Sequence, residues 1–278
     1  MSERDPATIW TPAEATGDSP SRRRLEGRRI LVVGAGTQPC DDADAPLGNG
    51  RAIAVLCARE GAAVACADRD EAAARDTAQR IASDGNRATI VVADVTDEAA
   101  CARVVADAEA GLGGLDGIVV NVGIGYGRGL EGTDVNMWDV TFAINLRAHF
   151  LVARAALPRL QPGAAIVFVS SIAGIKPGTG IPAYDASKAG LAGLCRHVAF
   201  EGARRGIRAN LVVPGLIDTP LGRLASRGRP SRATTTVPLG RQGTAWEVAY
   251  ATAFLLSGES SYVTGQQLVV DGGLSSLR

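Results

Sequence analysis

Three residues in the second half of the chain have the types and spacing needed for acid–base chemistry. Tyr184 and Lys188 lie four residues apart at the start of a predicted helix, so both side chains lie on one face. A lysine ammonium beside a phenol favours the phenolate and lowers the tyrosine pKa from about 10 toward neutrality, which suits proton transfer. Ser171 comes 13 residues before Tyr184, just past an apolar run, where its hydroxyl could hold a substrate oxygen. A YxxxK pair alone is more often an ordinary surface pair, so this interpretation needs support from the rest of the chain.

A glycine-rich stretch near the start of the chain predicts a phosphate-binding turn. Gly34 directly follows the apolar run 30–33, and Gly48, Asn49 and Gly50 open the next predicted helix. Glycines allow phosphate to approach the backbone closely, and the free N–H groups of a helix start bind it. The same glycines would also suit an ordinary surface loop, so this stretch alone leaves both interpretations open.

An insertion separates the two halves of this turn. The step between its first two glycines is 14 residues, whereas a G-x-x-x-G-x-G turn has a step of 4, so ten residues are extra. Three residues here, Asp41, Asp42 and Asp44, would repel a pyrophosphate. We therefore expect residues 38–46 to bulge outward into water, near the adenosine or over the rim of the cleft. Such a bulge is a tolerated insertion, a cover for the cofactor or a contact with a neighbouring subunit.

An acid at the end of the second apolar run bears on the choice of cofactor. Asp68 lies 34 residues after Gly34, and 24 remain once the ten extra residues are removed. In dinucleotide-binding domains an acid about 20 residues after the glycines binds the ribose hydroxyls. A carboxylate there accepts a hydrogen bond from the 2′-OH and repels a 2′-phosphate, so Asp68 favours NAD over NADP. The adjacent Arg69 either weakens this preference or is an exposed residue of the following helix.

The apolar pattern predicts an α/β fold. Seven short runs rich in Val and Ile are apolar on both sides of the pleat, which is typical of strands buried on both faces of a parallel sheet. Predicted helices alternate with these runs and lie near 50–60, 70–83, 97–110, 134–160, 183–205 and 244–257. We therefore expect a Rossmann-like, doubly wound parallel sheet of about seven strands with helices on both faces. It forms one domain over residues 28–278, and residues 1–27, with almost nothing to bury, are predicted to be a flexible arm.

Charge and composition argue against several classes of function. Lys and Arg together equal Asp and Glu in number, so there is no basic excess to indicate nucleic acid binding. No apolar run approaches the ~20 residues needed to span a bilayer. Five widely spaced cysteines without a CxxC motif, together with two histidines, indicate a reduced, cytoplasmic chain without a metal site.

In order and spacing, these motifs resemble those of the classical short-chain dehydrogenase/reductase family over about residues 28–273. The stretch VVAD places Asp94, followed by Val95, where the family contacts adenine. NVGIG stands where the family has NNAG, so Asn121 and Gly123 match, while two valines replace the family's other Asn and its Ala.

Two further stretches support the resemblance. FAINL places Asn145 at the position of the family's fourth catalytic residue. PGLIDTP matches the segment that meets the nicotinamide, and its cofactor-binding positions are Pro214, Gly215, Ile217 and Thr219.

The resemblance implies an NAD-dependent oxidoreductase that interconverts a secondary alcohol and a ketone. Tyr184 would take the proton from the alcohol while hydride passes to the nicotinamide. Ser171 would steady the charge that develops on the substrate oxygen, and Lys188 would bind the nicotinamide ribose and tune Tyr184. Asn145 would hold a water that links Lys188 to solvent.

Substrate specificity is expected from the segment 219–243, which would cover the nicotinamide. It has no acid and five arginines, namely Arg223, Arg227, Arg229, Arg232 and Arg241. These arginines either bind an anionic group of the substrate or form a solvated basic loop. The lining of the substrate site is expected to be small and apolar, with Ile172, Ala173, Ile175, Ile181, Leu216 and Leu221.

Two other functions and the assembly stay open at this point. One alternative is an NADP-dependent reductase of 3-oxoacyl groups on a carrier or on coenzyme A, although Asp68 argues against NADP. The other is a non-catalytic nucleotide-binding protein that kept the fold. Because the family is commonly tetrameric, we expect a homotetramer. An apolar stripe either packs across a subunit dyad or faces the chain's own sheet; it consists of Leu191, Leu194, Cys195 and Val198.

Overall fold

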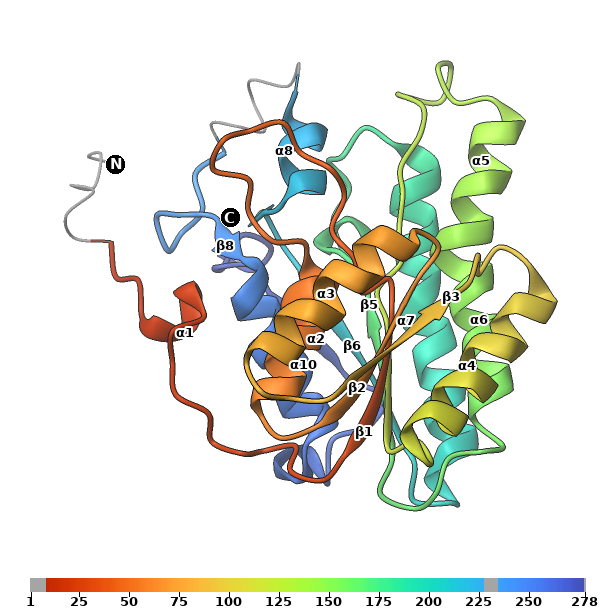
Figure 1. The fold of residues 1–278 in the computed structure, drawn as a ribbon. Coiled ribbons are helices and arrows are strands. Elements are labelled where there is room, and N and C mark those ends of the chain that lie inside the picture. The colour runs from red at the N-terminus through yellow and green to blue at the C-terminus, as the bar shows by residue number, and fades with distance from the viewer. Residues whose placement is uncertain (1–8, 228–234, 278) are drawn as a thin grey trace.

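One parallel sheet organises the computed structural model, which describes residues 9–227 and 235–277 (Figure 1). Its seven strands stand in the order β3-β2-β1-β4-β5-β6-β9, and every neighbouring pair is parallel. The strands are β1 Arg29–Val33, β2 Ala63–Asp68, β3 Ala88–Val92, β4 Gly117–Val120, β5 Ala165–Val169, β6 Arg208–Pro214 and β9 Gln267–Val270. The strand order reverses between β1 and β4, and in such sheets ligands bind at the carboxyl ends of the strands at that point.

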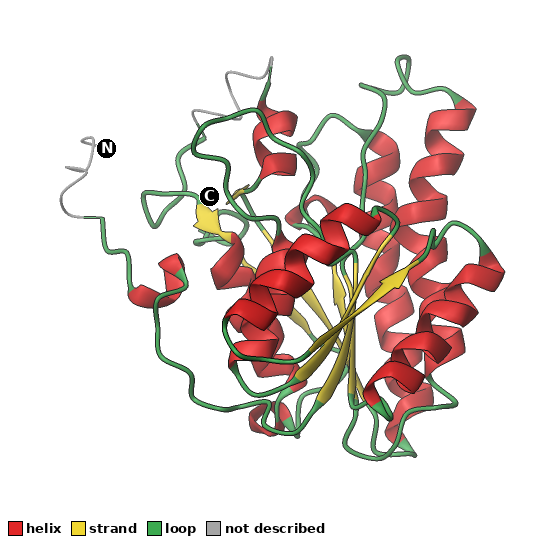
Figure 2. Ribbon diagram, viewed as in Figure 1, coloured by secondary structure: helices red, strands yellow, loops and turns green. Residues whose placement is uncertain are grey.

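Helices cover both faces of the sheet, as the sequence predicted (Figure 2). One apolar cluster joins the sheet to α4, α6 and α7, and a second joins the opposite face to α2, α3 and α10. The long predicted helix over 134–160 consists of α5, a π-helical turn and α6 in succession. The bounds are α2 Asn49–Arg59, α3 Glu71–Ser83, α4 Glu98–Leu112, α5 Val135–Phe142, α6 Ala148–Ala156, α7 Pro182–Ala203 and α10 Ala245–Leu256.

Side chains that cap the free N–H groups set where several helices begin. The carboxylates of Asp70 and Asp97 accept backbone hydrogen bonds at the starts of α3 and α4. Thr244 and Glu247 form a reciprocal capping box at the start of α10. These local signals fix the helix starts, while burial of strands on both faces fixes the layers.

Several short elements were not expected from the sequence. Close to the carboxyl ends of the strands lie β7 Ile217–Asp218, β8 Gly243–Thr244 and α8 Pro220–Ser226. The others are α1 Ala13–Thr16, η3 Ile172–Gly174 and η4 Gly258–Ser260. Segments of two to seven residues are too short to show a hydrophobic period, so tertiary contacts decide them.

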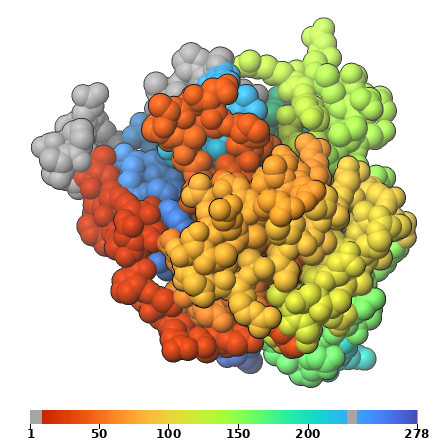
Figure 3. Space-filling model, in the orientation of Figure 1, coloured from red at the N-terminus to blue at the C-terminus, as the bar shows by residue number. Residues whose placement is uncertain are grey.

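The described part of the N-terminal segment, residues 9–27, differs from the flexible arm that the sequence predicted. Leu25 is fully buried within the apolar cluster that joins the sheet to α2, α3 and α10, and Ala15 is 1% exposed. Arg24 forms a buried ion pair with Glu60, and Figure 3 shows the segment lying along the body of the molecule. The sequence, which indicated almost nothing to bury here, does not reveal this burial, because a single leucine between charged residues carries no hydrophobic period.

The apolar stripe on α7 faces the chain's own sheet. Leu191, Cys195 and Val198 belong to the core cluster on that side, and the partly buried Leu194 packs against it. Of the two positions left open for this stripe, the structure therefore supports the intrachain one. Among the described residues, no helix combines the length and the hydropathy that crossing a bilayer would require.

Candidate active site

Two adjoining cavities lie at the carboxyl ends of the strands. The smaller, of about 290 Å³, runs past the turn after β1 and the ends of β2, β3 and β4, and we call it the nucleotide cavity. The larger, of about 970 Å³, lies between α7, η3 and α8, and we call it the substrate cavity. Predicted cofactor-binding residues that line the nucleotide cavity are Gly34, Gly48, Asn49, Gly50, Asp68, Asp94, Val95, Asn121, Gly123, Tyr184, Lys188 and Thr219.

Close backbone packing shapes the turn after β1. Gly34 has φ +80°, which favours glycine, and a Cβ on Gly50 would fall 1.8 Å from the Gly34 carbonyl oxygen. The Asn121 side chain donates to that same oxygen at 3.0 Å. Helix α2 begins after Gly48, which provides no side-chain cap, so its first N–H groups are available to a ligand. The buried Oδ1 of Asn49 has no partner among the described residues, so this cradle fits a dinucleotide.

Two carboxylates are fixed at the far end of the nucleotide cavity. Asp68 ends β2, and its Oδ2 accepts a hydrogen bond from the Gly36 N–H at 2.9 Å. Its Oδ1 accepts from the Asp70 N–H at 3.1 Å. Asp94 accepts from both the backbone and the hydroxyl of Thr96, and these bonds lower the pKa of its carboxyl. Backbone hydrogen bonds therefore orient both carboxylates, and the lowered pKa keeps the Asp94 carboxyl ionised at neutral pH.

Tyr184 lies where the two cavities meet, because it lines both of them. Lys188, one helical turn along α7, lines the nucleotide cavity, and Ser171, just after β5, lines the substrate cavity. The predicted trio is therefore brought together with the phenol in the middle. Pro182 at the first position of α7 starts this helix where Tyr184 reaches the cavities.

Lys188 is buried, with 4% of its surface exposed. Its Nζ donates to the Val169 carbonyl at 3.0 Å and lies 5.8 Å from the centroid of the Tyr184 ring. Burial lowers the pKa of Lys188 from 10.5 to about 7. The ammonium and amine forms are therefore both accessible near neutral pH.

Asn145 is fully buried in the π-helical turn Ala143–Arg147. Its carboxamide accepts from the Ile124 N–H and donates to the Ile124 carbonyl, both at 2.8 Å, and also donates to Ser187 Oγ at 3.0 Å. Asn145 itself is not among the described residues that line either cavity. Its side chain therefore holds the loop after β4 against α7, and its role in holding a water stays a prediction from the family resemblance.

The segment after β6 lies mainly on the substrate side. Pro214, Gly215 and Ile217 line the substrate cavity, and Thr219 lines both cavities. The hydroxyl of Thr219 caps α8 by accepting from the Gly222 N–H at 3.0 Å. Sequence alone had placed all four residues with the cofactor.

The expected apolar lining of the substrate cavity needs one correction. Ile172, Ala173, Ile181, Leu216 and Leu221 line it. Ile175, in contrast, is 49% exposed and is not among the described lining residues, because η3 ends just before it and turns it toward solvent.

The sequence missed two of the three cations that line the substrate cavity. Arg128 and Lys176 line it from loops whose positions no sequence period indicates, whereas the third, Arg227, follows α8 and was among the expected arginines. None of the described residues that line this cavity is acidic. The cavity therefore has a positive lining.

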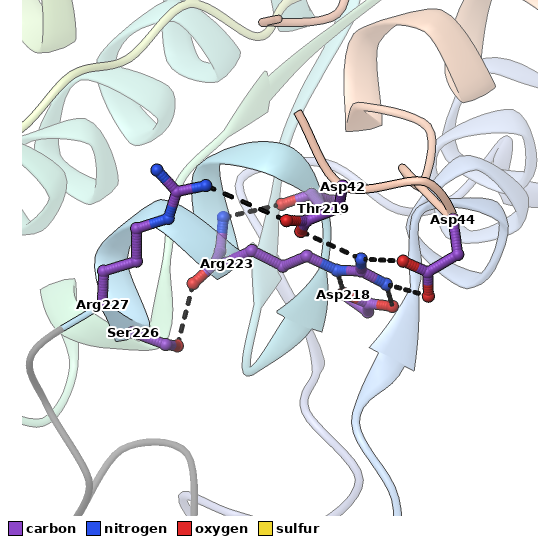
Figure 4. A network of polar contacts seen from close by, with 8 residues as sticks. Asp42, Asp44, Asp218, Thr219, Arg223, Ser226 and Arg227 are labelled. Carbon is purple, nitrogen blue, oxygen red and sulfur yellow. Dashed lines mark hydrogen bonds and ion pairs between the residues drawn. The ribbon is translucent and has the colours of Figure 1, made fainter. Parts of the chain in front are cut away.

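The insertion only partly follows its expected path. Gln38 and Pro39 line the nucleotide cavity, so the bulge begins two residues later than expected. The acids leave the cavity and turn toward α8, where Asp42 and Asp44 bind Arg223 (Figure 4). They lie over the rim of the cleft, one of the places the sequence had allowed.

The arginines of the substrate segment do not act as one group. Arg223 is occupied by carboxylates, and Arg241 forms an ion pair with Glu247 at 2.7 Å. Arg227 lines the substrate cavity and also forms a longer ion pair with Asp42, at 3.9 Å. Arg229 and Arg232 lie outside the described residues. Arg223 is therefore neither a solvated loop residue nor a member of a cluster of substrate-binding arginines.

Fold and site together define an oxidoreductase with a nicotinamide nucleotide site, and comparisons with known proteins agree. The family model described as enoyl-(acyl carrier protein) reductase matches residues 45–275. The chain belongs to the short-chain dehydrogenase/reductase family, whose members act on CH–OH groups and use NAD(P).

Relatives cover nearly the whole chain. It is 37% identical to the (3R)-3-hydroxyacyl-CoA dehydrogenase of Mus musculus, over 91% of this chain and 98% of the relative. It is 36% identical to the 3-oxoacyl-[acyl-carrier-protein] reductase FabG of Thermotoga maritima, over 90% and 99%. A crystal structure of a putative short-chain dehydrogenase/reductase from Burkholderia xenovorans is 39% identical, with TM-score 0.83 over 92% of this chain and 98% of that one.

Proposed function

We propose that the protein is an NAD-dependent oxidoreductase in which Tyr184 exchanges a proton with the alcohol or ketone oxygen of the substrate. The observation that carries this proposal is the place of Tyr184 at the junction of the two cavities. When bound, the nicotinamide accepts or donates the hydride. The protein's own residues bind the substrate oxygen and move its proton.

Ser171 and Lys188 prepare this proton transfer from opposite sides. Ser171 Oγ accepts from the Ala173 N–H at 3.2 Å, which leaves its own hydrogen to donate to the substrate oxygen. Lys188 is held by the Val169 carbonyl, and its pKa of about 7 lets it lose or regain a proton near neutral pH. A positioned acid–base group of this kind contributes about 10²–10⁴-fold in rate.

Asp68 supports NAD as the cofactor. Both of its oxygens are fixed by backbone N–H groups, so the negative charge stays at the cavity's far end. A 2′-phosphate would meet that charge, whereas a 2′-hydroxyl can donate to it. Arg69 lines the same cavity but is exposed, which weakens its opposing attraction through solvent screening.

A second candidate is an acyl thioester substrate with an anionic carrier, such as a 3-hydroxyacyl-CoA. The substrate cavity is large, and Arg128, Lys176 and Arg227 line it without an acid among its described lining residues. The names of two relatives, a 3-hydroxyacyl-CoA dehydrogenase and a 3-oxoacyl-carrier reductase, describe the same chemical class. Small secondary alcohols and acyl thioesters therefore both belong in the substrate screen.

We also propose a homotetramer located in the cytoplasm. Large apolar side chains are exposed on one group of helices, α5 to α7: Val135, Trp138, Phe150 and Phe200. An exposed apolar group of this kind is typical of a subunit interface.

Tyr184→Phe tests the catalytic proposal, because it removes the hydroxyl and keeps the ring. Turnover is followed by the absorbance of reduced cofactor, with secondary alcohols and 3-hydroxyacyl-CoA as substrates and NAD or NADP as cofactor. We expect kcat to fall by at least ~100-fold, with NADH binding unchanged by fluorescence titration. Tyr262→Phe, at a fully exposed tyrosine, is the matched control. Full turnover by Tyr184→Phe would instead favour another acid–base group.

A further inference from the structure

Two segments far apart in the sequence meet above the cleft (Figures 1 and 4). Asp42 and Asp44 belong to the insertion after β1, while Arg223 belongs to α8. Arg223 Nη1 donates to Asp44 at 2.7 Å and to Asp42 at 3.1 Å, and its Nη2 donates to Asp44 at 3.2 Å. The insertion is therefore bonded directly to the helix that begins the substrate segment.

The same guanidinium also binds the strand that precedes α8. Its Nε and Nη2 donate to the two oxygens of Asp218 at 2.7 and 3.0 Å. All three nitrogens of Arg223 are thus engaged, and three carboxylates surround one cation. Hydrogen bonds from Arg223 lower the pKa values of Asp42 and Asp44, so both acids stay ionised. We call the group of Asp42, Asp44, Asp218 and Arg223 the clasp.

The clasp joins the walls of both cavities. On one side, Gln38 and Pro39 of the insertion line the nucleotide cavity. On the other side, Thr219 and Leu221 at the start of α8 line both cavities. The side-chain hydrogen bonds of Arg223 therefore connect the two walls between which a nucleotide would lie.

We propose that Arg223 is a positioning residue: the clasp holds the insertion against α8 and thereby slows release of the nicotinamide nucleotide. The inference rests on the nucleotide cavity being the NAD(P) site. It gives Asp42 and Asp44 a role that fits their charge, because both bind a cation on α8 and neither lines the nucleotide cavity. Arg223 then serves neither as a substrate ligand nor as a solvated loop residue.

Two features make the effect measurable. Separating the insertion from α8 must break several hydrogen bonds to one guanidinium at once, and bidentate pairs of this kind are stronger than single ones. The pairs are also partly exposed, so salt screens them, since the Debye length falls from about 10 Å at 0.1 M to about 3 Å at 1 M. Nucleotide release should therefore depend on ionic strength through the clasp.

The experiment measures release of NADH by the loss of its fluorescence after stopped-flow mixing with excess NAD. Three variants change the clasp: Arg223→Met removes the cation, Arg223→Lys keeps the charge without the fork, and Asp42→Asn with Asp44→Asn neutralises the insertion. Arg159→Met is the matched control. It breaks a single exposed ion pair, in which Arg159 Nη1 lies 2.7 Å from a carboxylate oxygen of Glu109.

We expect Arg223→Met and the double aspartate variant each to speed NADH release by about 5-fold, as an exposed ion-pair network of about 1 kcal/mol would. The release rate of Arg223→Lys should lie between those of these two variants and that of the wild type, because lysine keeps the charge but not the fork. Raising NaCl from about 0.1 to about 1 M speeds release from the wild type and the control but changes the two charge-removing variants little.

Two outcomes would overturn the proposal. Release at the wild-type rate from the double aspartate variant, with faster release from Arg223→Met alone, would mean that Arg223 only anchors α8 through Asp218. Wild-type release from both would mean that the clasp does not cover the nucleotide. NADH binding is read directly, so these results do not depend on whether the proposed alcohol substrates turn over. A chain that bound no NADH would instead refute the nucleotide site itself.

Discussion

Replacing Lys188 with Met should make the folded protein more stable at neutral pH while removing its activity. Lys188 is fully buried, and its pKa falls from 10.5 to about 7 on folding. The unfolded chain therefore takes up a proton on Lys188 as the pH drops below 10.5, whereas the folded protein does so only near 7. This burial destabilises the fold progressively across that window and fully below it. Stability is thus lost to keep a titratable amine beside Tyr184.

The size of the effect follows from the pKa. Each pKa unit corresponds to about 1.4 kcal/mol, so the lowered pKa of Lys188 costs about 4 kcal/mol at pH 7 and about 1 kcal/mol at pH 10. Methionine fills a similar volume without charge but loses the hydrogen bond to the Val169 carbonyl, a loss of about 1 kcal/mol. We expect Lys188→Met to gain about 3 kcal/mol at pH 7 and nothing at pH 10.

The assay is urea unfolding of nucleotide-free protein at a series of pH values between about 6 and 10. Protein concentration is kept constant, because subunit association also shifts apparent stability. The chain contains two lysines, and the second, Lys176, is exposed. Lys176→Met is therefore the matched control, because it makes the same substitution at an exposed lysine.

Two results would refute this reasoning. Lys188→Met could be less stable than the wild type at every pH, which would mean that lost packing and hydrogen bonding outweigh the relieved charge. Its stability difference could instead be independent of pH, which would mean that the pKa of Lys188 is not lowered by folding. The first result would remove the expected gain in stability, and the second would remove the argument that Lys188 titrates near neutral pH.

The remaining predictions concern the cofactor and the N-terminal segment. Asp68→Asn should lower the ratio of kcat/KM for NAD to that for NADP by about 10-fold, since it removes the charge and keeps the shape. Arg69→Ala should shift this ratio the opposite way. An unchanged ratio in both variants would mean that the Asp68 carboxylate does not select the cofactor. Leu25→Ala should lower the free energy of unfolding by about 3 kcal/mol, because it opens a cavity in the α2–α10 cluster. A loss below about 0.5 kcal/mol, typical of an exposed site, would show that the N-terminal segment is not part of the folded core.

Much of the fold could be predicted from the sequence, because the signals are local and repeated. Strands buried on both faces carry uninterrupted Val and Ile runs, and the helices between them carry caps such as Asp70 and Asp97. The spacing of Tyr184 and Lys188 on one helix face likewise placed both beside the nucleotide cavity. These features need no knowledge of distant contacts.

Other parts of the site depend on partners far along the chain. The Asn145 side chain bonds Ile124 and Ser187, and no local pattern indicates those partners. The burial of Leu25 in the cluster under α2, α3 and α10 likewise depends on distant partners. Such contacts are set by the packing of the whole domain.

The insertion separates what the sequence determines from what only the tertiary structure determines. The sequence did not indicate where Asp42 and Asp44 lie in the fold. Because carboxylates repel phosphate, it indicated only that they must avoid the nucleotide. The sequence by itself determined the parallel sheet, the nucleotide turn and the placement of Tyr184 and Lys188 on one helix face, since each depends on residues close together or on a fixed period. Only the tertiary structure brought Arg223 from about 180 residues away to those acids, because a long-range ion pair depends on how β1, β6 and the segments after them fold over the same edge of the sheet.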